Sequence, residues 1–155
     1  MNVEVIWMAA LIGTSLMTLF SYAISRWHNE VYAEPVLINI MLSVPDDRSK
    51  NVSHKLAGWL LNYLIGFLIV LLFDCLWFTD IVSFSLGSTI VLGLSLGGVG
   101  VVSWRLMFFI AFYQPPVHQK VFYAQLFVAH FLFAIAVFMV YQYFGIHVTG
   151  ISALD

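Results

Sequence analysis

The chain has 155 residues, of which 62% are hydrophobic and only 9% are charged, and its mean hydropathy is +0.96. A soluble domain carries about 25% charged residues, so this composition excludes a water-soluble globular protein and a disordered chain. The net charge of −2 gives no basic footprint for nucleic acid. A single cysteine, Cys75, excludes an internal disulfide and a CxxC metal site.

Long uncharged gaps separate the charged residues. Four of these gaps hold 21, 18, 24 and 34 residues, and a membrane-spanning helix needs about 20 apolar residues. The gaps do not alternate polar and apolar residues as barrel strands do. We therefore predict an all-α integral membrane bundle within a single transmembrane domain, residues 1–155. Its four transmembrane helices are expected near 4–25, 56–79, 82–112 and 121–145.

The first predicted helix, 4–25, has no basic residue before its apolar run, which begins after Glu4. Because a signal peptide begins with a basic region, we expect a permanent span here. The following loop, 26–55, is the largest segment outside the predicted spans. Within it, Glu34-Pro35 predicts a helix start, because proline is tolerated at the first helical position.

A short amphipathic helix is expected in this loop, lying on the cytoplasmic headgroups. Its apolar face would consist of Val36, Leu37, Ile40 and Met41. The third predicted span, 82–112, would measure about 45 Å at 1.5 Å per residue, which is longer than a bilayer core requires. Pro115-Pro116 is expected to close it, because neither ring offers an N–H.

All basic residues fall on one side of a four-span topology. They are Arg26, Arg48, Lys50, Lys55, Arg105 and Lys120. The positive-inside rule assigns that side to the cytoplasm and predicts that both termini face outward.

Small residues are spaced to let helices approach closely. In the second span Gly58 and Gly66 lie on one four-residue stripe with Asn62 between them, and in the third Gly93 and Gly97 are four residues apart, with Gly100 one turn on. We interpret these five glycines as helix-packing residues rather than as the floor of a substrate groove.

Polar residues from all four spans share one depth in the cytoplasmic half. Polar groups at membrane depth are the best functional pointers available. The tentative ligand-binding set is Asn62, Tyr63, Arg105, Gln125 and His130. Thr18, Ser21, Tyr22, Ser103 and Trp104 lie at the same level.

Arg105 and His130 each allow two interpretations. Arg105 either snorkels to the headgroups or clamps an anionic head or a quinone-like carbonyl, with Glu30 or Glu34 as its partner. His130 is either a neutral histidine bonded to Asn62, Tyr63 or a serine of a neighbouring helix, or a group for haem ligation or proton transfer.

Other polar groups carry less information. We expect Asp74 to be a solvated acid at the outer interface. The chain lacks GxSxG, HExxH and P-loop motifs, so we predict no catalytic residue and no metal ligand, and the cofactor is unknown.

Several short motifs resemble a family of small bacterial inner-membrane proteins with four predicted helices, a domain of unknown function. The motifs are Gly13-Thr14 with Met17, Glu34-Pro35 with Leu37, Gly58-Trp59 through Asn62-Tyr63 to Gly66, Pro115-Pro116, and Ala129-His130. The family often has histidine where this chain has Asn62, which argues against a histidine pair with His130. The resemblance implies a bacterial inner membrane and supplies no catalytic residue.

The sequence leaves three functions open. We expect a structural or accessory subunit of a membrane complex, because the chain is small and rich in packing glycines. The alternative is a binding protein or enzyme for a lipid, quinone or other amphipathic molecule. An oligomeric transporter is the third. Expected partners are membrane lipids and either another protein or further copies of the chain.

Overall fold

The computed structural model describes residues 3–43, 52–110 and 117–144. These residues form five helices and no strand, which confirms the predicted all-α class. The helices are α1 (Val3–His28), α2 (Glu34–Ser43), α3 (Val52–Phe78), α4 (Leu86–Ile110) and α5 (Gln119–Tyr143). By length and composition, α1, α4, α5 and the part of α3 from Leu56 to Phe78 could each cross a membrane.

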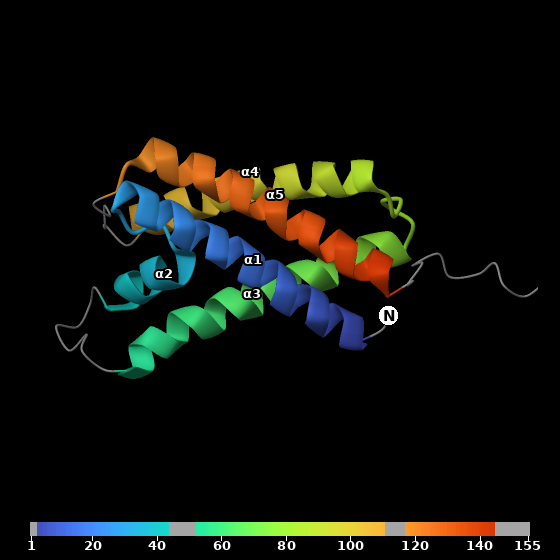
Figure 1. The fold of residues 1–155 in the computed structure, drawn as a ribbon, viewed down its shortest axis with the longest axis horizontal. Helices are drawn as coiled ribbons and strands as arrows, with labels where there is room; N and C mark the ends of the chain where they lie inside the picture. The colour runs from blue at the N-terminus through green and yellow to red at the C-terminus, as the bar shows by residue number, and fades with distance from the viewer. Residues whose placement is uncertain (1–2, 44–51, 111–116, 145–155) are drawn as a thin grey trace, which may run out of the picture.

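The four long helices form an arc that is open on one side. They alternate in direction, and their order across the arc is α4, α5, α1, α3 (Figure 1). Each of these helices packs against its neighbour in that order, whereas α3 and α4 make almost no direct contact. The structure therefore differs from the tight bundle expected from the glycine spacing, because α3 and α4 stand apart.

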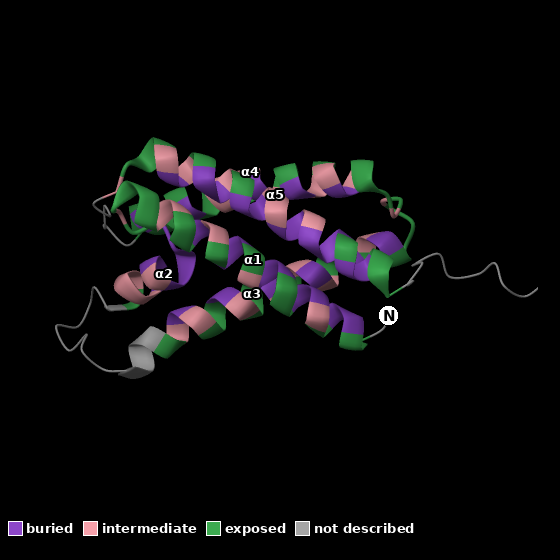
Figure 2. Cartoon of the chain, viewed as in Figure 1, coloured by how far each residue is buried: buried purple, intermediate pink, exposed green. Residues whose placement is uncertain are grey.

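Burial follows the same order. The apolar window of α5 is 56% buried and that of α4 only 17%, so α5 is central and α4 peripheral. Figure 2 shows buried positions on the faces that the helices turn toward one another and exposed positions on the outside. Large apolar side chains such as Leu19, Val102 and Phe109 are exposed on α1 and α4. Such an inverted surface needs an apolar surrounding.

Two clusters of buried side chains hold the arc together. One includes Trp77 of α3 and Tyr141 of α5, whose ring centroids are 5.2 Å apart. The other includes Trp104 of α4 and Phe122 of α5, 5.5 Å apart, together with Leu37 of α2. The first cluster ties α3 to α5, and the second ties α4 to α5 and α2.

The chain turns back into the bundle after α1. Asn29 adopts a left-handed conformation with φ of 54°, which asparagine tolerates better than most residues. Glu30 then accepts hydrogen bonds from the Tyr32 hydroxyl and from the backbone N–H of His118, the latter 2.7 Å long. These bonds fasten the turn to the start of α5, so that α2 begins inside the protein.

The position of α2 corrects the expectation that this helix lies on the headgroups. Glu34 and Leu37 are almost fully buried, and α2 packs against α3. A side chain at Gly58 of α3 would place its Cβ only 2.2 Å from the backbone oxygen of Pro35. The Gly58 N–H also donates a 2.8 Å hydrogen bond to Asn39. Close backbone contact therefore fixes α2 to α3.

The start of α4 differs from its predicted boundary. The helix begins at Leu86 rather than at residue 82, because Ser85 caps it. The Ser85 hydroxyl accepts a 3.2 Å hydrogen bond from the N–H of Ser88, which is the usual role of an N-cap serine. The predicted Pro115-Pro116 stop lies outside the described residues.

The other four selected glycines lie against helices of the same chain. A Cβ at Gly66 would lie 2.0 Å from the Thr14 hydroxyl of α1. On α4, Gly93 and Gly97 face Ala134 and Phe127 of α5, and Gly100 faces the His130 ring. The glycine stripe of α4 is therefore covered by α5.

Candidate functional site

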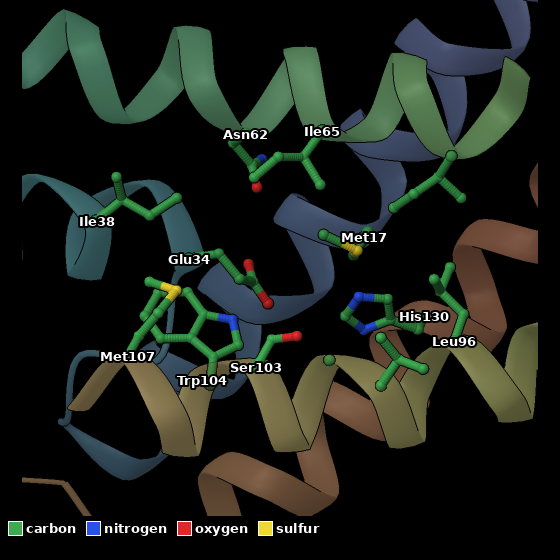
Figure 3. A pocket seen from close by; sticks show the side chains of 13 residues that line it. Met17, Glu34, Ile38, Asn62, Ile65, Leu96, Ser103, Trp104, Met107 and His130 are labelled. Carbon is green, nitrogen blue, oxygen red and sulfur yellow. The ribbon is translucent and has the colours of Figure 1, made fainter. Parts of the chain in front are cut away.

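A cavity of about 300 Å³ occupies the space between α3 and α4 (Figure 3). Every helix contributes to its lining. The residues are Met17, Glu34, Ile38, Asn62, Ile65, Ile69, Leu96, Val99, Gly100, Ser103, Trp104, Met107 and His130. Most are aliphatic or methionine, and the polar ones converge from α2, α3, α4 and α5. Apolar walls with a few convergent polar groups are typical of small-molecule sites.

Glu34 supplies the carboxylate of the cavity. It lies in the first turn of α2 and is only 2% exposed. Its Oε1 accepts hydrogen bonds from the Ser21 hydroxyl of α1 at 2.8 Å and from the Gln125 amide of α5 at 3.2 Å. Its Oε2 is buried without a hydrogen-bond partner in the described part of the chain. Glu34 therefore presents one satisfied and one unsatisfied oxygen.

Burial dominates the electrostatics of Glu34. Desolvation raises the pKa of this carboxyl to about 7, and the hydrogen bonds from its own backbone, Ser21 and Gln125 oppose the rise. The positive end of the α2 dipole also favours the ionised form. No lysine or arginine is among the described residues that line the cavity. The carboxyl therefore lies near its midpoint at neutral pH and has no counter-charge in the lining.

Asn62 faces the cavity from α3. Its amide nitrogen donates a 3.0 Å hydrogen bond to the Thr18 hydroxyl of α1. Figure 3 shows its carboxamide oxygen directed toward the space that Glu34 enters. The bond to Thr18 thus orients Asn62 so that an acceptor is presented to the cavity.

His130 closes the opposite side from α5. Its Nδ1 lies 2.8 Å from the carbonyl oxygen of Leu126 in the same helix. Because a carbonyl can only accept, Nδ1 carries the proton and Nε2 of the neutral ring is an acceptor. The ring packs on Gly100, where a Cβ would lie 2.8 Å from it. This contact corrects the interpretation in which His130 bonds to Asn62, Tyr63 or a neighbouring serine.

Ser103 and Trp104 complete the polar group from α4. Figure 3 shows the Ser103 hydroxyl and the Trp104 indole nitrogen pointing into the same space as Glu34. Neither group forms a hydrogen bond within the described ranges. The cavity therefore offers two donors, the Ser103 hydroxyl and the indole N–H. Its acceptors are Glu34, Asn62, His130 and the Ser103 oxygen.

The structure brings together only part of the predicted ligand-binding set. Asn62 and His130 line the cavity, and Gln125 lies one hydrogen bond behind it through Glu34. Tyr63 turns instead to Ser15 of α1, with 2.9 Å between their hydroxyl oxygens. Arg105 is exposed outside the lining.

The expected ion pair of Arg105 is not formed. Glu34 bonds to Ser21 and Gln125, and Glu30 bonds to Tyr32 and to the backbone of His118. Arg105 makes no ion pair with any residue that the structure describes. This geometry is consistent with the snorkelling interpretation, and the clamp stays a prediction.

Sequence reasoning did not include Glu34 in the ligand-binding set, because it treated Glu34 as a helix start and as a candidate partner of Arg105. A signal was present: Glu34 is the sole charged residue between Val31 and Ile38. A lone acid in an apolar run indicates burial, since apolar neighbours are typical of a protein interior and not of a solvated loop.

A second buried acid lies at the other end of the arc. Asp74 of α3 is 2% exposed and accepts a 3.0 Å hydrogen bond from the Tyr141 hydroxyl of α5. Its Oδ2 has no partner in the described ranges. The expectation of a solvated acid at the outer interface is wrong, because Tyr141 and the surrounding aromatic rings enclose this carboxyl.

No protein-family model, curated protein or solved structure compared with the chain matches it. The resemblance to the four-helix bacterial family therefore stays a prediction. Among the described residues, no group of three or more His, Cys, Asp and Glu could hold a metal ion. The cavity itself is therefore the feature of this chain that bears most directly on its function.

Proposed function

We propose that this chain is a multi-pass membrane protein that binds an amphipathic molecule in the cavity between α3 and α4. Four helices of sufficient length and their exposed apolar side chains support insertion in a bilayer. A molecule with a polar head and a hydrocarbon body matches a cavity whose polar groups converge among apolar walls.

The observation that carries this proposal is the unpartnered Oε2 of Glu34. An unsatisfied buried polar atom costs about 1–3 kcal/mol, and more when the group is charged. A bound head group that bonds to Oε2 would remove this cost, and the apolar walls would cover the adjoining hydrocarbon. Glu34 is also held from two sides, by Ser21 and Gln125, so it is positioned before any ligand arrives.

The separation of α3 and α4 supports entry from the membrane. Because these two helices make almost no direct contact, the cavity lies where a lipid chain could pass between them. A volume of about 300 Å³ is at the lower end for ligand sites, which suits a head group with its first few carbons. The remaining hydrocarbon would extend into the bilayer.

We further propose the orientation that the basic residues favour. The ends of α1 and α4 and the starts of α3 and α5 lie at one end of the arc (Figure 1). Arg26 lies in the last turn of α1, and Lys120 lies in the first turn of α5. The positive-inside rule assigns this end to the cytoplasm and directs both termini outward. Together with the resemblance to the four-helix bacterial family, this orientation favours a bacterial inner membrane.

The accessory-subunit reading gains less support from the structure. It was motivated by the small size of the chain and its packing glycines, and two of these glycines, Gly93 and Gly97, are covered by α5 of the same chain. No feature of the described helices favours the oligomeric transporter. Both functions stay predictions.

Native mass spectrometry of the full chain, gently extracted from its membrane, tests the binding proposal. We expect a reproducible small-molecule adduct on the wild type. Ser103→Phe should abolish it, because Ser103 points into the cavity and a phenyl ring would fill that space. Val102→Phe is the matched control, since Val102 is 66% exposed and outside the lining.

Two outcomes would contradict the proposal. One is a wild-type protein that carries no adduct after extraction in several mild detergents. The other is an adduct that persists in Ser103→Phe as strongly as in Val102→Phe, which would place the molecule elsewhere on the protein.

A further inference from the structure

We infer that the head group bound in this cavity is a cation, an alkyl ammonium whose positive charge pairs with the carboxylate of Glu34. This inference rests on the proposed binding function and names the chemical class of its ligand. It is carried by the geometry of Glu34 and by the charges of the residues that line the cavity.

The first step concerns charge. Glu34 is the one acid among the described lining residues, and none of them is a lysine or an arginine. An anionic head group would meet a like charge with no compensation, which strongly disfavours it in a low-dielectric site. A cation would pair with the carboxylate and supply the counter-charge that this buried acid lacks.

The second step concerns hydrogen bonds. Acceptors in the cavity outnumber donors, since Glu34 Oε2, Asn62 Oδ1, His130 Nε2 and the Ser103 oxygen all face it. A carbonyl head such as a quinone is acceptor-only and would leave most of these unpaired. A primary ammonium is donor-only, with three N–H groups, and therefore complements them.

The third step concerns the hydrogen bonds that Glu34 already accepts within the protein. Ser21 and Gln125 both bond to Oε1, which leaves Oε2 as the free oxygen. The donors that hold Glu34 come from behind, out of α1 and α5, and the cavity lies in front. One oxygen thus anchors the side chain and the other is available to a ligand.

The test is a head-group comparison at constant chain length. The full-length protein in neutral maltoside micelles is titrated with dodecylamine, dodecanol and dodecanoate, and the 1:1 adduct is measured by native mass spectrometry. We expect dodecylamine to bind roughly tenfold or more tightly than dodecanol, as a charge-assisted hydrogen bond predicts. Dodecanoate should bind most weakly.

Two variants locate the effect. Glu34→Gln should remove the preference for dodecylamine, because the amide keeps an acceptor for Ser21 and Gln125 but carries no charge. Asp80→Asn is the matched control, since it also neutralises one acid, and Asp80 is exposed and outside the cavity. It should bind dodecylamine as the wild type does.

A quaternary ligand gives an independent readout. Dodecyltrimethylammonium keeps its charge at every pH, so its binding reports protonation of the protein. Binding should weaken as the pH falls from 8 to 5.5, because Glu34 becomes neutral. Tyr22 of α1 interacts electrostatically with Glu34, and His130 of α5 shares the cavity, whereas the described lining residues of α3 and α4 carry no titratable group. His130→Gln should keep the pH dependence if Glu34 causes it.

Two sources could supply an alkyl ammonium, a single-chain amine and the head of an ethanolamine phospholipid. Adding that phospholipid to the micelles distinguishes them. Displacement of dodecylamine supports the ammonium assignment with the lipid head as the ligand. No displacement excludes the lipid head, and the preference for dodecylamine over dodecanol then supports a single-chain amine.

The failures of the two proposals are distinguishable. If none of the three dodecyl compounds binds, the proposed binding function fails. If dodecanol or dodecanoate binds as tightly as dodecylamine, the cation assignment is overturned while the binding function stands. Equal binding of dodecylamine by the wild type and Glu34→Gln would also overturn the assignment.

Discussion

Glu34 and Ser21 are joined by a 2.8 Å hydrogen bond that links the start of α2 to the interior face of α1. Ser21 lies seven residues before the end of α1, about 10 Å along the helix axis. The turn after α1 therefore carries an acid back into the protein to the depth of Ser21. This return brings Glu34 to the wall of the cavity.

The first prediction concerns the pH dependence of stability. The folded pKa of Glu34 is raised to about 7 from an ordinary value of 4.5. A raised folded pKa adds stability that is fully present below about pH 4.5 and is lost as the pH rises through 7. Glu34→Gln lacks this loss and should be more stable than the wild type at pH 8, by up to about 3 kcal/mol.

Thermal unfolding in detergent at pH 5 and pH 8 checks this prediction. The advantage of Glu34→Gln should be small at pH 5 and several degrees in Tm at pH 8. A difference that is the same at both pH values would show that Glu34 is not buried in its neutral form.

The second prediction concerns the contact of α2 with α3. Gly58→Ala places a Cβ against the backbone oxygen of Pro35, which cannot move as a flexible side chain would. We expect a loss of about 1–3 kcal/mol and displacement of α2, because overpacking at a backbone contact costs about this much. Gly87→Ala is the control, since nothing lies within 4 Å of its added Cβ.

Tm and limited proteolysis of the segment after α1 report the two effects. Gly58→Ala should be less stable and should be cut faster between α1 and α3, while Gly87→Ala should match the wild type. Equal behaviour of the two alanine variants would refute the close contact at Gly58.

The third prediction concerns Arg105. Arg105→Ala should leave the native adduct in place, because this side chain is exposed and lies outside the cavity lining. Native mass spectrometry beside Ser103→Phe supplies the comparison. Loss of the adduct in Arg105→Ala would restore the clamp interpretation and place the head group near the surface.

The fourth prediction concerns the buried pair at the other end of the arc. Tyr141→Phe removes the hydroxyl that donates to Asp74 and leaves a buried carboxyl without that partner. We expect a loss of about 1–3 kcal/mol. In the double variant with Asp74→Asn the loss should be smaller than the sum of the single losses, because the amide carries no charge to leave unpaired.

A double-mutant cycle measured by Tm or chemical denaturation in detergent gives this coupling. Additive losses would show that the Tyr141–Asp74 bond contributes nothing beyond its two separate side chains.

The sequence identified several elements well because their signals are local. Runs of about 20 apolar residues predicted the long helices, and Glu34-Pro35 predicted the start of α2. Boundaries were less certain. Ser85 was available as an N-cap, yet the apolar residues before it extended the predicted third helix to residue 82.

The sequence predicted that polar residues from all four spans share one depth, but not which of them face the cavity. Asn62 and His130 were placed at one depth by helical arithmetic, and the structure brings both to one cavity. Depth along a helix is encoded in residue number, but direction around the axis depends on which neighbour the helix faces. Tyr63 and Arg105 share that depth and face elsewhere.

Composition and spacing alone determined the class of this protein: an all-helical chain whose apolar segments are long enough to cross a membrane. They did so because hydropathy and helix length are properties of contiguous residues. Tertiary structure decided the site. The chain returns into the bundle after α1, α3 and α4 stand apart, and Glu34 is buried between Ser21 and Gln125. These features depend on contacts between residues far apart in sequence. Such contacts depend on packing, which no local pattern records.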